Sequence, residues 1–144
     1  MASIPLKLAD KICDTVIDAG QELGLKPLGV AVVDDGGWLI SYKRADGASF
    51  FRFELAYGKA YAAAGLGFPK TSGLQQFLES RPLFTEYLNE QSNRKFLADA
   101  GGVKIHDADG KFIGAVGVTG DVSLHDEQAA LMALDTLNLR ITPT

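Results

Sequence analysis

The stretch L-G-V-A-V-V-D-D-G-G-W-L-I-S-Y-K, residues 28–43, decides the fold class. Residues 28–33 are an apolar run rich in β-branched side chains, which is typical of a buried strand. The Asp-Asp-Gly-Gly segment at 34–37 supplies the positive φ angles of a tight turn, and residues 38–43 provide the returning strand. The stretch therefore predicts an antiparallel hairpin.

A second hairpin is predicted near the C-terminus, with an Asp-rich turn at 106–110 between its strands. Parallel strands need long crossover connections, so two tight hairpins exclude an all-parallel sheet. Apolar spacing and glycine or proline boundaries predict helices around the hairpins. The predicted strands are 28–34, 38–43, 102–105 and 112–119, and the predicted helices are 5–23, 51–66, two short helices between 71 and 88, and 124–139. The class is α+β, an antiparallel sheet flanked by helices.

Composition limits the domain count and the partners. A chain of 144 residues fits one domain, 1–144. With 14 basic and 18 acidic side chains it lacks the positive charge of a general nucleic-acid binder. No apolar run reaches the length of a membrane span, and charges interrupt the N-terminal segment where a signal peptide would be apolar. Cys13 is the only cysteine, which excludes an intramolecular disulfide. We expect a cytoplasmic protein that binds neither nucleic acid nor membrane.

The helix at 51–66 carries a candidate anion site. Arg52 and Lys59 share one helical face with Ala56 and Ala63 between and after them. Two cations separated by methyl side chains form a shallow basic strip that suits a carboxylate or a propionate. The alternative is a solvated face on which Lys59 extends past the sheet.

The last helix begins with a candidate catalytic or metal-binding group. His125 stands in its first turn beside Asp126 and Glu127. Ser123 and Asp126 have the spacing of a capping box, which by itself accounts for Asp126. A neutral imidazole beside two carboxylates can also serve as a haem ligand or a general base.

The glycine-rich stretch at 114–120 lies in a strand pattern and indicates a close backbone approach, not a phosphate loop.

Several motifs in fixed order carry a family resemblance. They are R-A-D-G-A at 44–48, F-E-L-A-Y-G-K-A-Y at 53–61, G-G-V at 101–103, G-A-V-G-V-T-G-D at 114–121 and D-E at 126–127. Together they make the chain resemble the GlcG/HbpS-like family of small haem-binding or haem-degrading domains, which also form the C-terminal part of some cobalamin adenosyltransferases. The resemblance implies a profilin-like fold with a five-stranded antiparallel sheet, a homo-oligomer, and haem or a related tetrapyrrole as ligand in some members.

The first of two functions left open is a haem-binding accessory protein. Haem propionates would meet Arg52 or Lys59, and His125 or Tyr57 would approach the iron. We expect Arg52, Lys59 and the junction at 125–127 to surround one pocket, with another subunit as a possible contributor.

The second function is a catabolic enzyme: a tautomerase, hydrolase or deaminase acting on a small anionic unsaturated acid from aromatic-compound degradation. The candidate residues divide by role. The carboxylate clamp would be Arg44, Arg52, Lys59 and Arg81, and the proton-transfer groups would be His125, Asp126 or Glu127.

Overall fold

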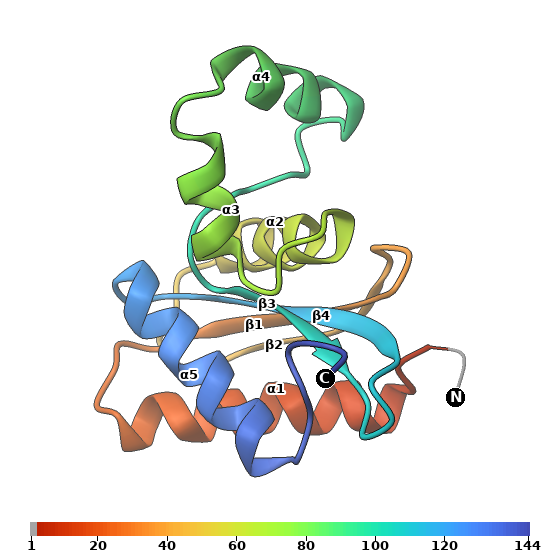
Figure 1. The fold of residues 1–144 in the computed structure, drawn as a ribbon. Helices are drawn as coiled ribbons and strands as arrows, with labels where there is room; N and C mark the ends of the chain where they lie inside the picture. The colour runs from red at the N-terminus through yellow and green to blue at the C-terminus, as the bar shows by residue number, and fades with distance from the viewer. Residues whose placement is uncertain (1–2) are drawn as a thin grey trace.

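The two predicted hairpins form one antiparallel sheet in the computed structural model, which describes residues 3–144. Five helices surround the sheet (Figure 1). In chain order the elements are α1 (Leu6–Glu22), β1 (Gly29–Asp34), β2 (Leu39–Arg44), α2 (Arg52–Gly65), α3 (Thr71–Leu78), α4 (Pro82–Gln91), β3 (Gly102–His106), β4 (Phe112–Thr119) and α5 (Ser123–Thr136). The α+β class and both hairpins are confirmed.

The sheet has four strands in the order β2-β1-β4-β3, where five were expected. Two single bridges, Lys70 to Val103 and His106 to Arg140, lie outside the named strands. The segments at Lys70 and Arg140 do not continue as strands. Helix α3 begins at Thr71, directly after Lys70, and Asn138, two residues before Arg140, takes a positive φ of 57°. The five-stranded sheet is therefore a wrong prediction for the described residues, and the profilin-like fold stays a prediction.

Helices cover both faces of the sheet. Figure 1 shows α1 and α5 below the strands and α2 above them. The main core lies between the sheet and α1 with α5, where Ile12 and Val16 of α1 are fully buried against Val30 and Val32 of β1. Burying each such side chain contributes about 1.5–3 kcal/mol to the stability of the fold. This explains why α1 packs with its apolar face against the sheet.

The backbone of α2 rests directly on β4. A Cβ atom added to Gly117 would overlap the carbonyl oxygen of Ala56 and the amide of Ala60, so a side chain there is incompatible with this packing. The close backbone approach predicted for the glycine-rich stretch is confirmed. Because α2 packs this closely on β4, the side chains of α2 that point toward the sheet reach the end of β4.

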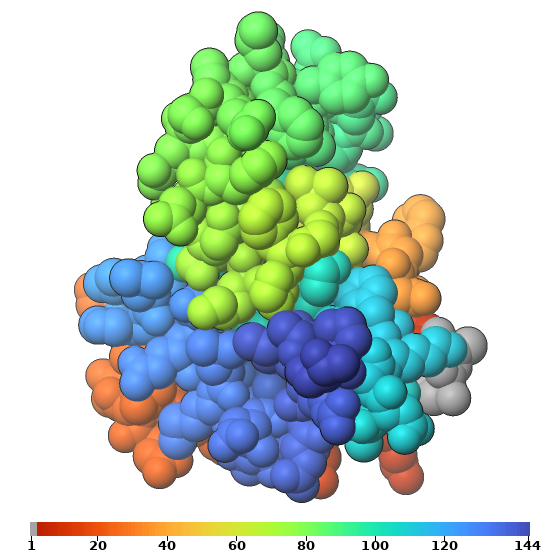
Figure 2. All heavy atoms as spheres, viewed as in Figure 1, coloured from red at the N-terminus to blue at the C-terminus, as the bar shows by residue number. Residues whose placement is uncertain are grey.

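The α3–α4 lobe projects from the rest of the molecule (Figure 2). Leu74 and Leu78 of α3 are buried, whereas α4 has no buried residue. None of the helices in the described part of the chain is long and apolar enough to cross a membrane.

Candidate functional site

Several chain segments meet at one end of the sheet, which we call the His125 end. There β1 begins, β2 and β4 end, and α2 and α5 start, on the left of Figure 1. The register pairs Gly29 with both Arg44 and Thr119, so these three residues form one row across the strands. Paired residues face the same side of a sheet, and this is the side that α2 covers.

The His125 imidazole is exposed, and a carboxylate orients it. Its Nδ1 lies 2.9 Å from Oδ1 of Asp121, and 53% of the His125 side chain is exposed. Asp121 also accepts hydrogen bonds from the amides of Lys26 and Val122, which together with His125 lower its pKa to about 2. In the neutral ring, a proton on Nδ1 would donate to the ionised Asp121 and leave the lone pair on Nε2. This is the arrangement that metal-ligating histidines use.

Lys59 is buried between α2 and this end of the sheet. Lys59 is 2% exposed, and its Nζ donates to the carbonyl of Val118 at 3.0 Å. The same Nζ lies 3.4 Å from Oδ2 of Asp126 and 3.8 Å from Oδ2 of Asp99. The solvated-face alternative is therefore wrong. Lys59 shares the expected helical face, but its charge is already compensated inside the protein.

Asp126 is a partner of Lys59 and not a helix cap. The N-cap of α5 is Val122, so Ser123 lies inside the first turn, where its hydroxyl donates to Asp99 at 2.8 Å. Asp126 is 1% exposed and accepts from the amide of Asp121 at 2.9 Å and from Lys59. Burial raises the pKa of Asp126, against the Asp121 amide and Lys59, which lower it. The predicted capping box is wrong because the buried ammonium draws the carboxylate inward.

The remaining carboxylate of the junction, Glu127, is 8% exposed, and its buried Oε1 has no hydrogen-bond partner within residues 3–144. Its position one residue after Asp126 does not bring it to the exposed imidazole of His125.

Arg52 lies at the His125 end, half-buried at the start of α2. Its Nη1 donates to Oγ1 of Thr119 at 3.1 Å. Arg44 is exposed and lies in one row of the sheet with Gly29 and Thr119. Within residues 3–144, neither guanidinium lies within 4.0 Å of a carboxylate oxygen. Both charges are therefore available to an acidic ligand.

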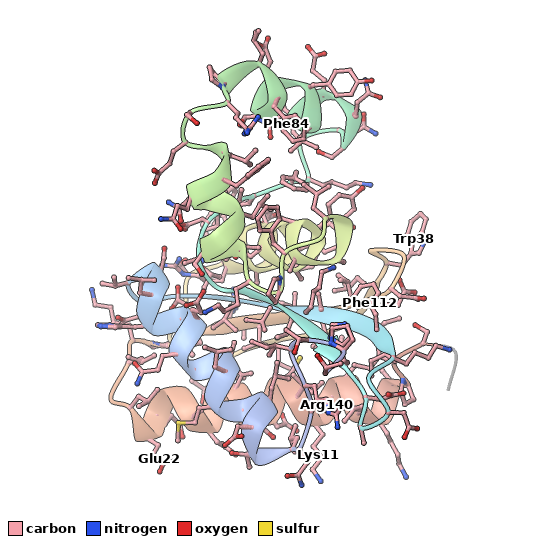
Figure 3. All side chains as sticks on the ribbon, viewed as in Figure 1. Lys11, Glu22, Trp38, Phe84, Phe112 and Arg140 are labelled. Carbon is pink, nitrogen blue, oxygen red and sulfur yellow. The ribbon has the colours of Figure 1, made fainter. Side chains whose placement is uncertain are left out.

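Tyr57 and Arg81 lie elsewhere. The Tyr57 hydroxyl donates to the carbonyl of Gly37 at 3.3 Å, in the turn between β1 and β2. Figure 3 shows the neighbouring Trp38 projecting from this turn, at the end of the sheet opposite the start of α5. The Arg81 guanidinium lies 4.4 Å from the ring centroid of Phe77 in the α3–α4 lobe. The structure does not bring these two residues to His125.

Sequence reasoning missed two groups that shape the site. Asp121 stands four residues before His125, the spacing of neighbours across one helical turn, and that signal was available. Asp99 gave no local signal, because it reaches Lys59 and Ser123 only through the fold.

Two exposed apolar side chains precede His125 in the sequence and border a hollow of mixed lining. Val122 and Leu124 are 64% and 63% exposed. Together with Ser123 and Asp99 they line a hollow of about 470 Å³, and polar side chains from α3 and its C-cap, including Gln75 and Glu79, form its other wall. An exposed imidazole nitrogen next to uncovered apolar side chains suits a flat, largely apolar ligand that carries a metal.

Known proteins match nearly the whole chain. A relative from Citrobacter freundii, an uncharacterised 15.0 kDa protein of the dhaT–dhaS intergenic region, is 30% identical over 136 residues, which are 94% of this chain and 92% of that protein. The crystal structure of HbpS superposes with a TM-score of 0.80 at 29% identity over 95% of this chain and 92% of that one. The crystal structure of a PduOC:heme complex has a TM-score of 0.82 at 23% identity over 97% and 99% of the two chains, and shows the shared fold.

The family relationship follows from a match over most of the sequence. The model of the family described as haem degrading protein HbpS-like matches residues 4–135, which include every strand and the whole His125 end. The chain belongs to the family of HbpS-like haem-degrading proteins.

Proposed function

We propose that this chain is a haem- or tetrapyrrole-binding accessory protein and that its ligand binds at the His125 end. The observation that carries the proposal is the pair of Asp121 and His125, in which a carboxylate held by two backbone amides contacts Nδ1 of an exposed imidazole. Membership of the HbpS-like family and the haem in the PduOC complex support the same class of ligand.

The residues present fit a haem group. His125 would supply a nitrogen ligand to the iron, and Asp121 would raise its basicity and fix the orientation of its ring. The exposed side chains of Val122 and Leu124 would contact the face of the macrocycle. Arg52 would meet a propionate, whereas Lys59 would stay in its buried ion pair with Asp126. The bound iron would supply any redox chemistry.

A hemin titration followed by the Soret band tests this proposal. Wild-type protein should give a saturable, shifted band, and His125→Ala should lose that shift. Gln128→Ala is a matched control, because Gln128 is exposed on the same helix outside this hydrogen-bond network. An unchanged Soret spectrum for His125→Ala would remove His125 as the ligand.

The enzyme alternative is favoured by one observation, the buried Asp126. Its raised pKa and its contact with Lys59 are typical of a group that holds a proton for transfer. We propose as the second candidate that the chain acts on an unsaturated carboxylic acid bound by Arg44 and Arg52. Deuterium exchange into unsaturated dicarboxylates, measured by NMR with wild type and Asp126→Asn, tests it. Exchange that Asp126→Asn leaves unaltered would exclude this role for Asp126.

We also propose that the protein is a homo-oligomer and works in the cytoplasm. The exposed apolar side chains of the α3–α4 lobe support an interface, with Leu83, Tyr87 and Phe84 at 80%, 63% and 46% exposure. Phe50 and Phe51, at 84% and 52%, are a second candidate contact next to Arg52. Light scattering that returned only the 15.4 kDa monomer would contradict the oligomer.

A further inference from the structure

Three side chains at the His125 end, one from α2 and two from β2, carry a charge or a hydroxyl group that has no ionic or hydrogen-bond acceptor partner of its own among residues 3–144. We infer that Arg44, Arg52 and Tyr42 form a carboxylate-binding subsite, which takes the acid group of the ligand. The inference rests on the proposed function only for the identity of that ligand. The subsite itself is a property of the protein without haem and can be tested without it.

Gly29 defines the centre of the subsite. It occupies the strand row between Arg44 and Thr119. A Cβ atom placed on Gly29 would come within 2.7 Å of Cβ of Arg52 and 3.2 Å of the Tyr42 hydroxyl oxygen. Arg52 and the Tyr42 hydroxyl therefore approach the same point of the sheet, and the absence of a side chain on Gly29 permits that approach.

The Tyr42 hydroxyl is a buried donor without an acceptor. Among the residues that the structure describes, its oxygen has no hydrogen-bond partner, and leaving a buried polar group unpaired costs about 1–3 kcal/mol. The ring is fixed edge-on to Phe53 at a centroid distance of 5.1 Å. Burial raises the pKa of Tyr42, and the charges of Arg44, Glu54 and Arg52 act on it more weakly. The hydroxyl is therefore protonated at neutral pH and can donate to a carboxylate oxygen.

The charges around this point favour an anion. Of the charged groups that act on the Tyr42 hydroxyl, Arg44 and Arg52 are two cations and the exposed Glu54, in the first turn of α2, is one carboxylate. Arg52 directs Nη1 toward the neutral hydroxyl of Thr119, which leaves its charge uncompensated. A guanidinium offers up to five N–H donors in a planar fork that matches a carboxylate.

The subsite lies close enough to His125 to serve one ligand. Thr119, which contacts Arg52, precedes Asp121 by two residues, a span of at most about 7 Å of extended chain. Asp121 in turn contacts His125 at 2.9 Å. A metal-bearing macrocycle with its metal at His125 would thus direct an acidic side group toward Arg52 and Arg44.

The first test uses the ligand-free protein and succinate as the probe. Saturable shifts are expected in the backbone amide NMR signals of Gly29 and Thr119, and the uncharged succinamide should produce none. Arg44→Gln with Arg52→Gln should weaken succinate binding about tenfold or more, whereas Arg94→Gln, an exposed arginine after α4, should not. Tyr42→Phe should weaken binding without lowering thermal stability, because its hydroxyl has no partner to lose. Absence of saturable shifts, or equal binding by the double variant, would overturn the subsite.

The second test compares hemin with hemin dimethyl ester, which lacks both acid groups. Wild-type protein should bind hemin about tenfold more tightly than the ester, and the double arginine variant should bind the two equally. Equal binding by wild type would overturn the role of the subsite in tetrapyrrole binding. Failure of both porphyrins to bind would contradict the proposed function, and the succinate result would still decide the subsite.

Discussion

Lys59 joins three elements of the structure through one ammonium group. It extends from α2, donates to the carbonyl of Val118 near the end of β4, and contacts Asp126 in the first turn of α5. Both partners of this ion pair are almost fully buried, with side-chain exposures of 3% and 1%. Burying two charges is costly, so the pair determines the arrangement of these elements more than it adds net stability.

Lys59→Met should lower the free energy of unfolding by about 3–5 kcal/mol, because Asp126 would stay buried without its counter-charge. Urea denaturation followed by circular dichroism measures the change. The double variant Lys59→Met with Asp126→Leu should recover part of the loss. Lys111→Met, at an exposed turn position, is the control. A loss for Lys59→Met no larger than for this control would show that the charge is solvated.

Asp121 makes stability depend on pH at the acidic end. Its pKa in the folded protein is about 2, below its ordinary value of 3.8. The unfolded chain therefore binds a proton more readily, and the contribution of Asp121 is fully present above about pH 4 and is lost as the pH falls toward 2. Asp121→Asn should be less stable than wild type at pH 6, and this difference should shrink between pH 4 and pH 2. Thermal unfolding across that range measures it, and a constant difference would contradict the assignment.

The same residues show what local sequence can and cannot reveal. Helical spacing placed Arg52 and Lys59 on one face correctly, because that depends only on the period of the helix. The burial of Lys59 depends on Asp126 and Asp99, which come from other elements of the fold. Tyr57 and Arg81 were grouped with the site by residue type alone, and the structure places them far from His125.

At the level of elements, α2 and β4 fit together through a glycine. Gly117→Ala would place a methyl group against the backbone of Ala56 and Ala60. Because neither backbone can rotate away, α2 must shift, and overpacking of this kind costs about 1–3 kcal/mol or more. Gly67→Ala is a matched control, since a Cβ there meets nothing within 4 Å. Thermal unfolding should show a lower midpoint for Gly117→Ala alone, and equal midpoints would contradict the close packing.

The hairpins were predictable because turn chemistry and strand pattern are local properties of residues 28–43 and 102–119. The number of strands was not. It came from a family resemblance, whereas the outer segments at Lys70 and Arg140 make only single bridges in this structure. Helix α5 begins at Ser123, one residue before the predicted start at residue 124. Ser123 was expected to cap the helix, but its hydroxyl donates to Asp99 instead.

At the scale of the whole molecule, the α3–α4 lobe is the part least explained by a monomer. An isolated helix of ten residues is marginal in water, and α4 buries none of its side chains. An aromatic chain of Phe68, Phe77 and Phe84 runs along the lobe with centroid separations of 5.2 and 6.1 Å. Figure 3 places Phe84 inside the curve of the lobe, away from the sheet. A second copy that covered Leu83 and Tyr87 would stabilise α4 where the sheet cannot.

Leu83→Glu should therefore dissociate the proposed homo-oligomer. The side chain is 80% exposed in the single chain, so the substitution costs the monomer little, whereas a carboxylate placed in an apolar interface would be desolvated without a partner. Light scattering should return a multiple of 15.4 kDa for wild type and 15.4 kDa for Leu83→Glu. Leu6→Glu, which changes a leucine of 63% exposure on α1, should keep the wild-type mass. If Leu83→Glu also kept that mass while Phe51→Glu lost it, the interface would lie at the start of α2 beside Arg52, and hemin binding would then depend on the oligomer.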